Sequence, residues 1–464
     1  MDSPEREQLL GRIAELEKGL AEAQALIQVL KEEVENLKRG GKRQAVPFAR
    51  RERIEKPKKR GRRKGQGRFT QREKPSEEEV NETKKAEISG CPSCGSELVE
   101  LKEHEQYEID IPEVKPVITR YQMVSGNCPQ CGKRHWMYHP DQISRATGAA
   151  GVVIGPRAKA LAADLKHRFG ASYGKVCEVL NDAFGLNVTR SAWCQADQRL
   201  GKQAEAVYQK MIQALQSCVV VHSDETGWRI GTLSAWLWVF TSQQITVYTI
   251  EKSRGHEVIV NILGKEFKGV LVSDCFLAYD HRNLAEWLKQ KCLSHLLKDL
   301  KELNETKTRG AVRFARNVTA LLQDALKLKT QKQQLTSVKF AQQAADLETR
   351  LDQLINARRQ LSDPDNARFA KRLRKHRHHI LRFLYLDDLD ATNNQAERML
   401  RPAVITRKTN GCNRSDGGAQ THAVLSSILA TCRQQAVPIL DYLIQLQRFG
   451  DTPPSLTNCL SPTT

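Results

Sequence analysis

The five-residue motif Cys-Pro-x-Cys-Gly occurs twice in the sequence, at residues 91–95 and 128–132. In each copy a tight turn directs two thiolates toward one ion, and the glycine accepts the backbone conformation of the turn. A redox-active dithiol is the alternative interpretation. Two copies supply the tetrahedral set of thiolates that structural zinc prefers, with no position left open. The motifs predict one structural Zn²⁺ bound by Cys91, Cys94, Cys128 and Cys131.

The segment between the two motifs alternates apolar and polar residues. Tyr107, Ile109 and Ile111 are separated by Glu108 and Asp110. A second run has the same period of two, at Val117, Thr119, Tyr121 and Met123. This alternation is typical of strands, so we expect residues 86–140 to form a zinc-binding β-ribbon.

Much of the formal net charge of +19 lies in one short segment. Residues 38–75 contain 17 Lys or Arg and three Glu, a net charge of +14. Lys and Arg neutralise phosphates and release counterions, so nucleic acid is the strongest candidate partner and an acidic membrane surface a weaker one. Because the segment is rich in Gly and poor in apolar residues, we expect residues 40–85 to be a disordered linker.

Within this linker a compact run of cations surrounds one glycine. Such an arm can lie in a narrow AT-rich minor groove, whose negative potential attracts Arg. A solvated basic linker without groove contacts is equally consistent with the composition, and it would still add salt-sensitive affinity. The candidate DNA-binding residues are Lys58, Lys59, Arg60, Arg62, Arg63 and Lys64.

The cysteines and the N-terminus bear on the cellular compartment. Of 12 cysteines, four lie in the two motifs and eight are scattered, which suits metal ligation in a reducing cytosol better than a disulfide framework. No apolar run approaches the roughly 20 residues of a membrane span, and residues 1–17 are charged throughout. We expect a soluble cytoplasmic protein with no membrane partner.

Near the N-terminus, apolar residues recur in alternating steps of four and three. They are Leu9, Ile13, Leu16, Leu20, Ala23, Ile27, Leu30, Val34 and Leu37. This heptad pattern predicts a parallel two-stranded coiled coil over residues 1–39, and therefore a homodimer or a higher oligomer. A lone amphipathic helix packed on its own domain is the alternative.

Helical periodicity dominates residues 150–215, which predicts a helical domain. Residues 173–184 and 188–200 are expected to form two helices joined by a short turn that contains Gly185. The pattern resembles a helix-turn-helix reader of DNA, with Arg190 opening the second helix as a DNA contact. Ordinary helix packing gives the same pattern, so both interpretations stay open.

Two short apolar runs each close on a Ser-Asp pair, the first at Asp224 and the second at Asp274. The expected elements are strands at 218–223, 234–241, 244–251 and 269–273, with a helix at 256–263. In an α/β sheet of this order the first and fourth strands can lie side by side, so that both carboxylates converge.

Converging carboxylates suit Mg²⁺ or Mn²⁺, which leave their other positions to water and phosphate. Two such ions, roughly 3.5 to 4 Å apart, promote in-line displacement at phosphorus. A single Asp at a strand end is more often a turn residue or a helix cap. A third carboxylate is available at Glu397, in the opening turns of a helix that Thr392 or Asn393 can cap.

Three runs carry a family resemblance. They are Ser-Asp-Glu-Thr-Gly-Trp-Arg from Ser223, Ser-Asp-Cys-Phe-Leu-Ala-Tyr-Asp from Ser273, and Asn-Asn-Gln-Ala-Glu-Arg from Asn393. Together they closely resemble the transposases of bacterial insertion-sequence family sixty-six, and the resemblance covers nearly the whole chain. The sequence departs from the family at residues 61–67, where members tend to show a Pro-Gly-His-rich run.

The resemblance implies a multidomain α+β protein with a ribonuclease-H-like α/β core of the DDE type. Asp224, Asp274 and Glu397 carry over as the catalytic, magnesium-binding triad, two ions per site. Glu225 is the second choice because it should point to the opposite face of the strand. Arg398 and Arg401 are expected to contact DNA.

An inserted all-α domain is expected between the second and third members of the triad, because residues 296–386 are almost wholly helical in pattern. Its basic stretch at residues 368–379 either grips DNA or forms a solvated helix face. Just before it, Cys292-x-x-His295 resembles an element that several DDE transposase groups carry after the second Asp. We treat both residues as auxiliary, with a buried Cys and a core His as the alternative.

The expected modules run in order along the chain. They are a coiled coil (1–39), a basic linker (40–85), a zinc β-ribbon (86–140), a helix-turn-helix-like domain (150–215), the first part of the core (216–295), the insertion (296–386), the second part of the core (387–450) and a tail (451–464). The resemblance implies a transposase on the bacterial nucleoid that acts on the terminal inverted repeats of its element and on target DNA, with element-encoded accessory proteins as further candidate partners. A non-catalytic DNA-binding repressor and a nuclease that never joins strands are the alternatives.

Overall fold

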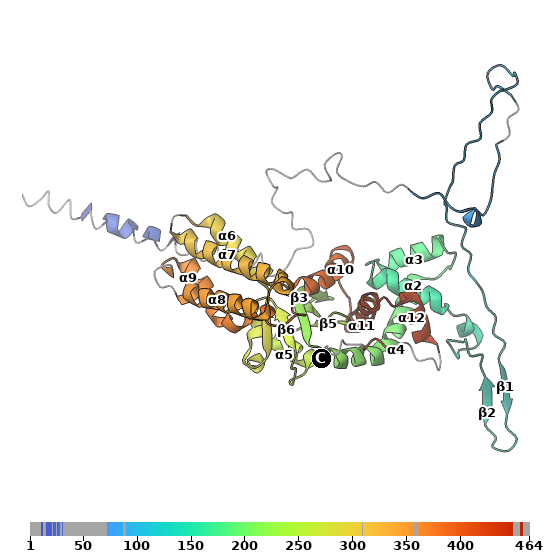
Figure 1. Cartoon of the computed structure of the whole chain (residues 1–464). Coiled ribbons are helices and arrows are strands. Elements are labelled where there is room, and N and C mark those ends of the chain that lie inside the picture. The colour runs from blue at the N-terminus through green and yellow to red at the C-terminus, as the bar shows by residue number, and fades with distance from the viewer. Residues whose placement is uncertain are drawn as a thin grey trace, which may run out of the picture. The chain divides into compact units, whose positions relative to one another are not determined.

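The computed structural model describes residues 72–86, 90–308, 310–356, 361–448 and 455–457, with short stretches between residues 11 and 30 (Figure 1). The chain divides into two compact units, Arg50–Val117 on the one hand and Met1–Ala49 with Ile118–Thr464 on the other. The basic arm at residues 58–64 and most of the tail lie outside the described residues.

The described residues between 11 and 30 are helical, as the heptad pattern predicts. On the apolar stripe, Leu16, Leu20 and Leu30 expose 68%, 60% and 50% of their surface. The other half of the heptad pattern falls outside the described residues, so the coiled coil stays a prediction.

The predicted β-ribbon between the two cysteine motifs is wrong in its position. Residues 101–123 contain no strand, and Ile109, Ile111 and Val117 are at least three-quarters exposed. The strands are instead β1 (Val124–Asn127) and β2 (Arg134–Met137), an antiparallel hairpin around the second motif. Alternation alone does not fix a strand, because its backbone needs a hydrogen-bonded neighbour.

Three helices follow the hairpin in the same unit: α2 (Pro156–His167), α3 (Tyr173–Asp182) and α4 (Arg190–Gln216). The side chains of Ser172 and Thr189 cap α3 and α4 by accepting backbone N–H bonds from Lys175 and Ala192. Gly185 and Asn187, between these helices, have positive φ angles. The two-helix prediction is confirmed, but α4 runs past the expected end at Leu200 because its second half packs against the sheet.

The central sheet has the strand order β5-β4-β3-β6-β7. Its strands are β3 (Val220–Ile230), β4 (Leu233–Thr241), β5 (Thr246–Glu251), β6 (Val270–Ser273) and β7 (Leu288–Lys291). The first three are antiparallel neighbours, while β6 is parallel to both β3 and β7. The expected pairing of the first and fourth strands is confirmed. β7 was not predicted, because its Lys-Gln-Lys segment lacks an apolar run.

Helices cover this sheet on both sides. α4, α5 (His256–Leu263), α11 (Asp416–Gln434) and α12 (Ile439–Gln447) share one core with inward side chains of β3, β4 and β6. The helix α10 (Asn394–Asn410) buries Ala396 and Leu400 in a second core with Leu237 and Val239. The chain is therefore a mixed α/β protein in which α10 lies directly on β3 and β4.

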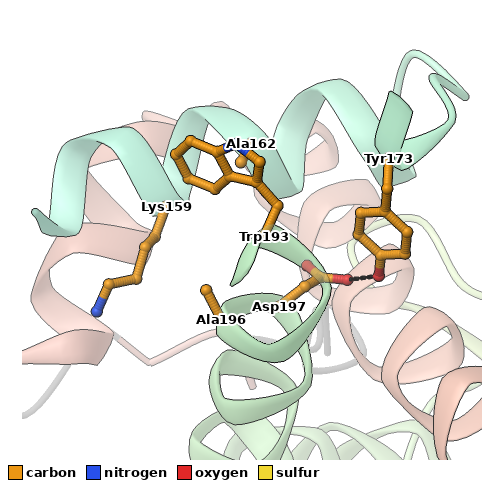
Figure 2. Close-up of a pocket in the computed structure, with 6 residues that line it drawn as sticks. All are labelled: Lys159, Ala162, Tyr173, Trp193, Ala196 and Asp197. Atoms are coloured by element: carbon orange, nitrogen blue, oxygen red, sulfur yellow. Dashed lines mark hydrogen bonds between the residues drawn. The ribbon is translucent and has the colours of Figure 1, made fainter. Parts of the chain in front are cut away.

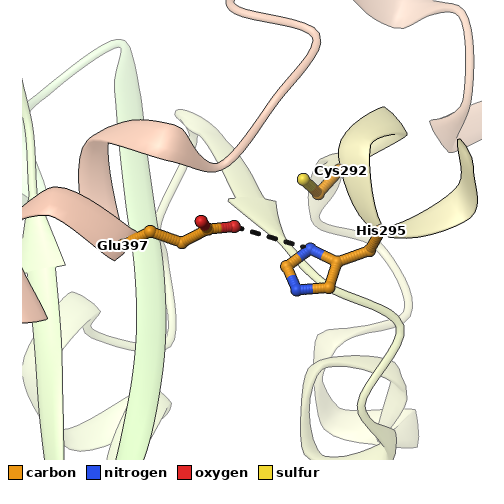
Figure 3. Close-up of side chains that lie close together, drawn as sticks. All are labelled: Cys292, His295 and Glu397. Carbon is orange, nitrogen blue, oxygen red and sulfur yellow. Dashed lines mark ion pairs between the residues drawn. The ribbon is translucent and has the colours of Figure 1, made fainter. Parts of the chain in front are cut away.

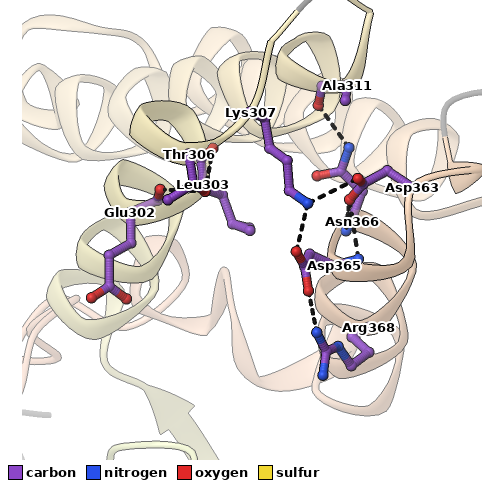
Figure 4. Close-up of polar contacts among 9 residues, drawn as sticks. All are labelled: Glu302, Leu303, Thr306, Lys307, Ala311, Asp363, Asp365, Asn366 and Arg368. Carbon is purple, nitrogen blue, oxygen red and sulfur yellow. Dashed lines mark hydrogen bonds and ion pairs between the residues drawn. The ribbon is translucent and has the colours of Figure 1, made fainter. Parts of the chain in front are cut away.

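The segment between the sheet and α10 is helical, as predicted. It contains α6 (Leu293–Thr306), α7 (Ala311–Thr330), α8 (Ser337–Asn356) and α9 (Pro364–Lys375), which share a separate apolar core. At the end of α6, Lys307 Nζ contacts Asp363 at 2.9 Å and Asp365 at 2.5 Å, and Asn366 Nδ2 donates to the Ala311 carbonyl (Figure 4). These polar contacts bind the start of α9 to the α6–α7 turn.

The basic stretch at residues 368–379 takes part in this packing. Arg368 pairs with Asp365, Arg372 with Asp299 at 2.7 Å, and Arg377 with Asp352 and Glu348. These arginines are held by carboxylates of the helical segment in the structure described. No helix among the described residues is long and apolar enough to cross a membrane.

Candidate active site

The parallel pairing of β3 with β6 brings the two predicted aspartates to neighbouring positions. The register pairs His222 with Val272, and each Asp lies two residues further along its strand. Asp274 follows the last residue of β6, as expected. Asp224 was expected to end its strand, but β3 continues to Ile230 because β4 pairs with it over that whole length. At Asp224, β6 has ended, so β3 is paired there with β4 alone.

The carboxylates in this region repel one another. Burial and the neighbouring charges of Glu225 and Asp274 together raise the pKa of Asp224 to about 8, while His295 opposes the shift. Asp224 Oδ1 accepts the backbone N–H of Glu225 at 2.9 Å, and Asp274 Oδ1 accepts that of Phe276 at 2.9 Å. The arrangement concentrates negative charge in a half-buried place, which a divalent cation would neutralise.

Glu225 is occupied by other partners. Arg254 donates to its Oε1 from Nη2 at 2.7 Å and from Nε at 3.0 Å, and the Tyr279 hydroxyl donates to its Oε2 at 2.8 Å. The Ser223 hydroxyl lies 3.2 Å from the same tyrosine oxygen. Residues 223 and 225 alternate with Asp224 along β3, so they face the other side of the strand. Tyr279 lies in the run from Ser273 that carries the family resemblance, but the sequence assigned no role to Tyr279 or to Arg254.

Glu397 lies in the first turn of α10, and the start of this helix is bonded to β3. Asn393, fully buried, donates from Nδ2 to the Ser223 carbonyl at 2.8 Å, and its Oδ1 lies 3.3 Å from His222 Nδ1. Asn393 is at the N-cap position, as expected, but its side chain bonds to β3 instead of capping the helix. The asparagine thus fixes the start of α10 against β3, at Ser223.

The auxiliary pair from the sequence lies next to Glu397 (Figure 3). His295 Nδ1 is 3.8 Å from Glu397 Oε1, and ligand atoms of Cys292, His295 and Glu397 all lie within 4.8 Å of one another. Cys292 is fully buried, and its sulfur accepts the backbone N–H of Asn393 at 3.1 Å. The neighbouring side chain of Cys292 is the main cause that raises the pKa of His295 to about 9.

The predicted DNA-binding residues that the structure describes are all on the surface. Arg398 and Arg401 are exposed on α10, and Arg190 is exposed at the start of α4. Each arginine therefore has the accessibility that a phosphate contact requires.

The two cysteine motifs have the same local geometry, each described within its own unit. Gly95 donates its N–H to the Cys91 carbonyl at 2.8 Å, and Gly132 donates to the Cys128 carbonyl at 2.9 Å. The φ angles of the two glycines are 78° and 67°, the left-handed conformation that glycine accepts. Hydrogen bonds lower the pKa of Cys94, chiefly from Ser96, and of Cys128, chiefly from backbone N–H groups. Lower thiol pKa values favour the thiolates that bind metal.

A buried polar network joins the helices that precede the sheet to α11, and Figure 2 shows its bond between Tyr173 and Asp197. Asp197 Oδ2 accepts the Tyr173 hydroxyl at 2.6 Å and lies 2.9 Å from His167 Nε2, whose other ring nitrogen lies 3.0 Å from His422. The network joins α2, α3 and α4 to α11. Charged groups and hydrogen bonds here fix how the helical domain packs against the sheet.

The mixed α/β core and the cysteine motifs have relatives among proteins that act on nucleic acid. The family model described as Transposase IS66 family matches residues 151–421, and the model for the zinc-finger binding domain of transposase IS66 matches residues 89–132. The chain belongs to the IS66 family of transposases.

One curated relative is the uncharacterized protein y4qI of Sinorhizobium fredii (strain NBRC 101917 / NGR234). It is 26% identical over 294 residues, which are 56% of this chain and 53% of the relative. The chain therefore spans about half the length of the curated relative it matches.

Proposed function

We propose that the protein is a transposase that cleaves and joins DNA strands with divalent metal ions bound by Asp224, Asp274 and Glu397. The observation that carries the proposal is the β3–β6 register, which brings the two aspartates together, with Asn393 bonding the helix of Glu397 to the same strand. The sheet order, three antiparallel strands followed by two parallel ones, supports a ribonuclease-H-like core.

The residues present fit Mg²⁺ or Mn²⁺. Burial, with the charges of the neighbouring Glu225 and Asp274, raises the pKa of Asp224, and carboxylate oxygens are the ligands that these ions prefer. Two bound ions would supply activation of the attacking oxygen and stabilisation of the leaving one.

The protein's own residues position this set. Asn393 fixes the start of α10 against β3, and Arg254 with Tyr279 holds Glu225 on the opposite side of the strand. Arg398 and Arg401 are exposed close to Glu397 in sequence, where they would bind the phosphates on either side of the reacting bond. Arg190, at the start of α4, would make a DNA contact away from the chemistry.

The zinc-finger domain supports a zinc-binding site, for which we propose Cys91, Cys94, Cys128 and Cys131 as ligands of one structural Zn²⁺. The exposed leucines of the N-terminal helix support dimerisation by a coiled coil. Sedimentation of the full chain and of one lacking residues 1–39 tests the second proposal. The truncated chain should have the mass of a smaller oligomer, and an unchanged oligomer would place dimerisation in the core.

The decisive experiment incubates the full chain with Mg²⁺, linear DNA that carries the ends of its element, and a target plasmid. Joined products are expected for a transposase. Nicked DNA without joined products would indicate a nuclease, and bound but intact DNA would indicate a repressor. Either of the last two outcomes overturns the proposal.

A further inference from the structure

We propose that Cys292, His295 and Glu397 form a zinc site of their own, which shares Glu397 with the carboxylate site beside it. The site is separate from the cysteine motifs at residues 91–95 and 128–132. The existence of the zinc site does not depend on the proposed transposase chemistry. Only its effect on activity, through Glu397, rests on that proposed function.

The geometry of the three side chains suits a tetrahedral ion (Figure 3). In tetrahedral zinc sites with bonds of about 2.0 to 2.3 Å, neighbouring ligand atoms lie roughly 3.3 to 3.8 Å apart. Here His295 Nδ1 and Glu397 Oε1 are 3.8 Å apart, and all three ligand atoms fall within 4.8 Å of one another. Small side-chain rotations bring the set to bonding distances.

Backbone hydrogen bonds hold the three residues in this arrangement. Cys292 is the N-cap residue of α6, and His295 lies in the first turn of that helix. The Cys292 N–H donates to the Ser273 carbonyl at 2.8 Å, next to Asp274. Leu293 N–H donates to the Ala391 carbonyl at 2.9 Å, shortly before α10 begins. The start of α6, the end of β6 and the start of α10 are thus bonded together around the site.

An unsatisfied nitrogen provides independent support. His295 Nδ1 is buried and has no hydrogen-bond partner among the described residues. Leaving a buried polar atom without a hydrogen bond is costly, and such atoms in native proteins call for an explanation. A bound cation in contact with Nδ1, with the buried sulfur of Cys292 beside it, satisfies this atom.

The chemistry of the ligands selects the ion. Thiolate and imidazole favour Zn²⁺ over Mg²⁺, which binds oxygen. Three protein ligands leave a fourth position open to water. Because Glu397 is also the proposed third ligand of the magnesium site, zinc bound here competes for that carboxylate. We therefore expect free Zn²⁺ to inhibit Mg²⁺-dependent strand cleavage.

The test counts zinc in the full chain after dialysis against a buffer of fixed free Zn²⁺. Cys292→Ser and His295→Asn should each contain one zinc fewer per chain than the wild type. Cys194→Ser, at a half-buried cysteine in α4, and His281→Ala, at a histidine after β6, should match the wild type. Zinc bound at the two cysteine motifs contributes equally to every variant, so it does not affect the difference in zinc content between variants.

Equal zinc content in the wild type, Cys292→Ser and His295→Asn would overturn the site. Thermal melts check that the variants are folded. Glu397→Gln provides a third test, because the half-exposed side chain of Glu397 is not needed for the core. This substitution should weaken zinc binding at the site by at least about tenfold. If added Zn²⁺ does not change Mg²⁺-dependent strand cleavage by the wild type, the two sites do not share Glu397. A wild type that binds the extra zinc but never cleaves DNA would refute the proposed function alone.

Discussion

The cysteine motifs and the carboxylate site differ in how their ligands are brought together. Each cysteine motif places two thiols three positions apart on one tight turn, whose hydrogen bonds and glycine are all local. The carboxylates come from position 224 on β3, position 274 just after β6, and position 397 on α10. The turn of each cysteine motif needs little of the fold, whereas the three carboxylates can meet only when the sheet and α10 are assembled.

The largest effect in this comparison is expected at the assembled site. Asp224→Asn and Glu397→Gln each remove a charged metal ligand and keep the size of the side chain, so strand cleavage should fall by about 100-fold or more. DNA affinity should stay within a few-fold, because phosphate contacts lie elsewhere. Arg398→Ala should do the reverse, with weaker DNA binding and a smaller salt dependence.

Cleavage and filter-binding assays on the same preparations measure both quantities. Near-wild-type cleavage by Glu397→Gln would remove Glu397 from the triad and make Glu225 the next carboxylate to test.

The second prediction tests whether Asn393, which is not a proposed metal ligand, positions the helix that carries Glu397. Asn393→Ala leaves the buried Ser223 carbonyl without its side-chain donor, so the protein should lose about 1 to 3 kcal/mol of stability. With the helix of Glu397 less well fixed, the rate at saturating Mg²⁺ should fall by about 10- to 100-fold. Asn394→Ala, at the exposed neighbouring position, is the matched control. Equal rates for the two variants would mean that Asn393 does not position the helix.

The third prediction concerns the local site. Cys91→Ser should lower the zinc content of the chain and loosen the unit that contains it, while the sheet keeps its thermal transition. Elemental analysis and differential scanning calorimetry measure the two effects. A main transition that shifts together with the zinc content would contradict the independence of the two regions.

The last prediction is a pH dependence of the stability of the metal-free protein. The pKa of Asp224 is raised to about 8 by burial and by neighbouring carboxylates, so the folded state holds this proton more tightly than the unfolded state. The free energy of unfolding should therefore fall as the pH rises from about 4 to about 8. Asp224→Asn should make this slope shallower, and Mg²⁺ should stabilise the wild type most at the upper end. If the free energy of unfolding depends on pH equally in the wild type and in Asp224→Asn, Asp224 is not the group that causes the dependence.

Features that depend on local pattern can be predicted from the sequence alone. The apolar runs fixed the strands that carry Asp224 and Asp274, and the Cys-Pro-x-Cys-Gly repeats fixed two tight turns, because hydrophobic periodicity and glycine conformation act over a few residues. The same reasoning misplaced the β-ribbon at residues 107–123, where alternating side chains have no neighbouring strand to pair with.

Which distant residues meet depends on the tertiary structure. The side chain of Asn393 bonds to β3 instead of its own helix, Arg254 and Tyr279 occupy Glu225, and Cys292 with His295 lies beside Glu397. The spacing of these residues in the sequence does not predict any of these contacts. They follow from the β3–β6 register and from the packing of α10 on the sheet, which join segments far apart in the chain.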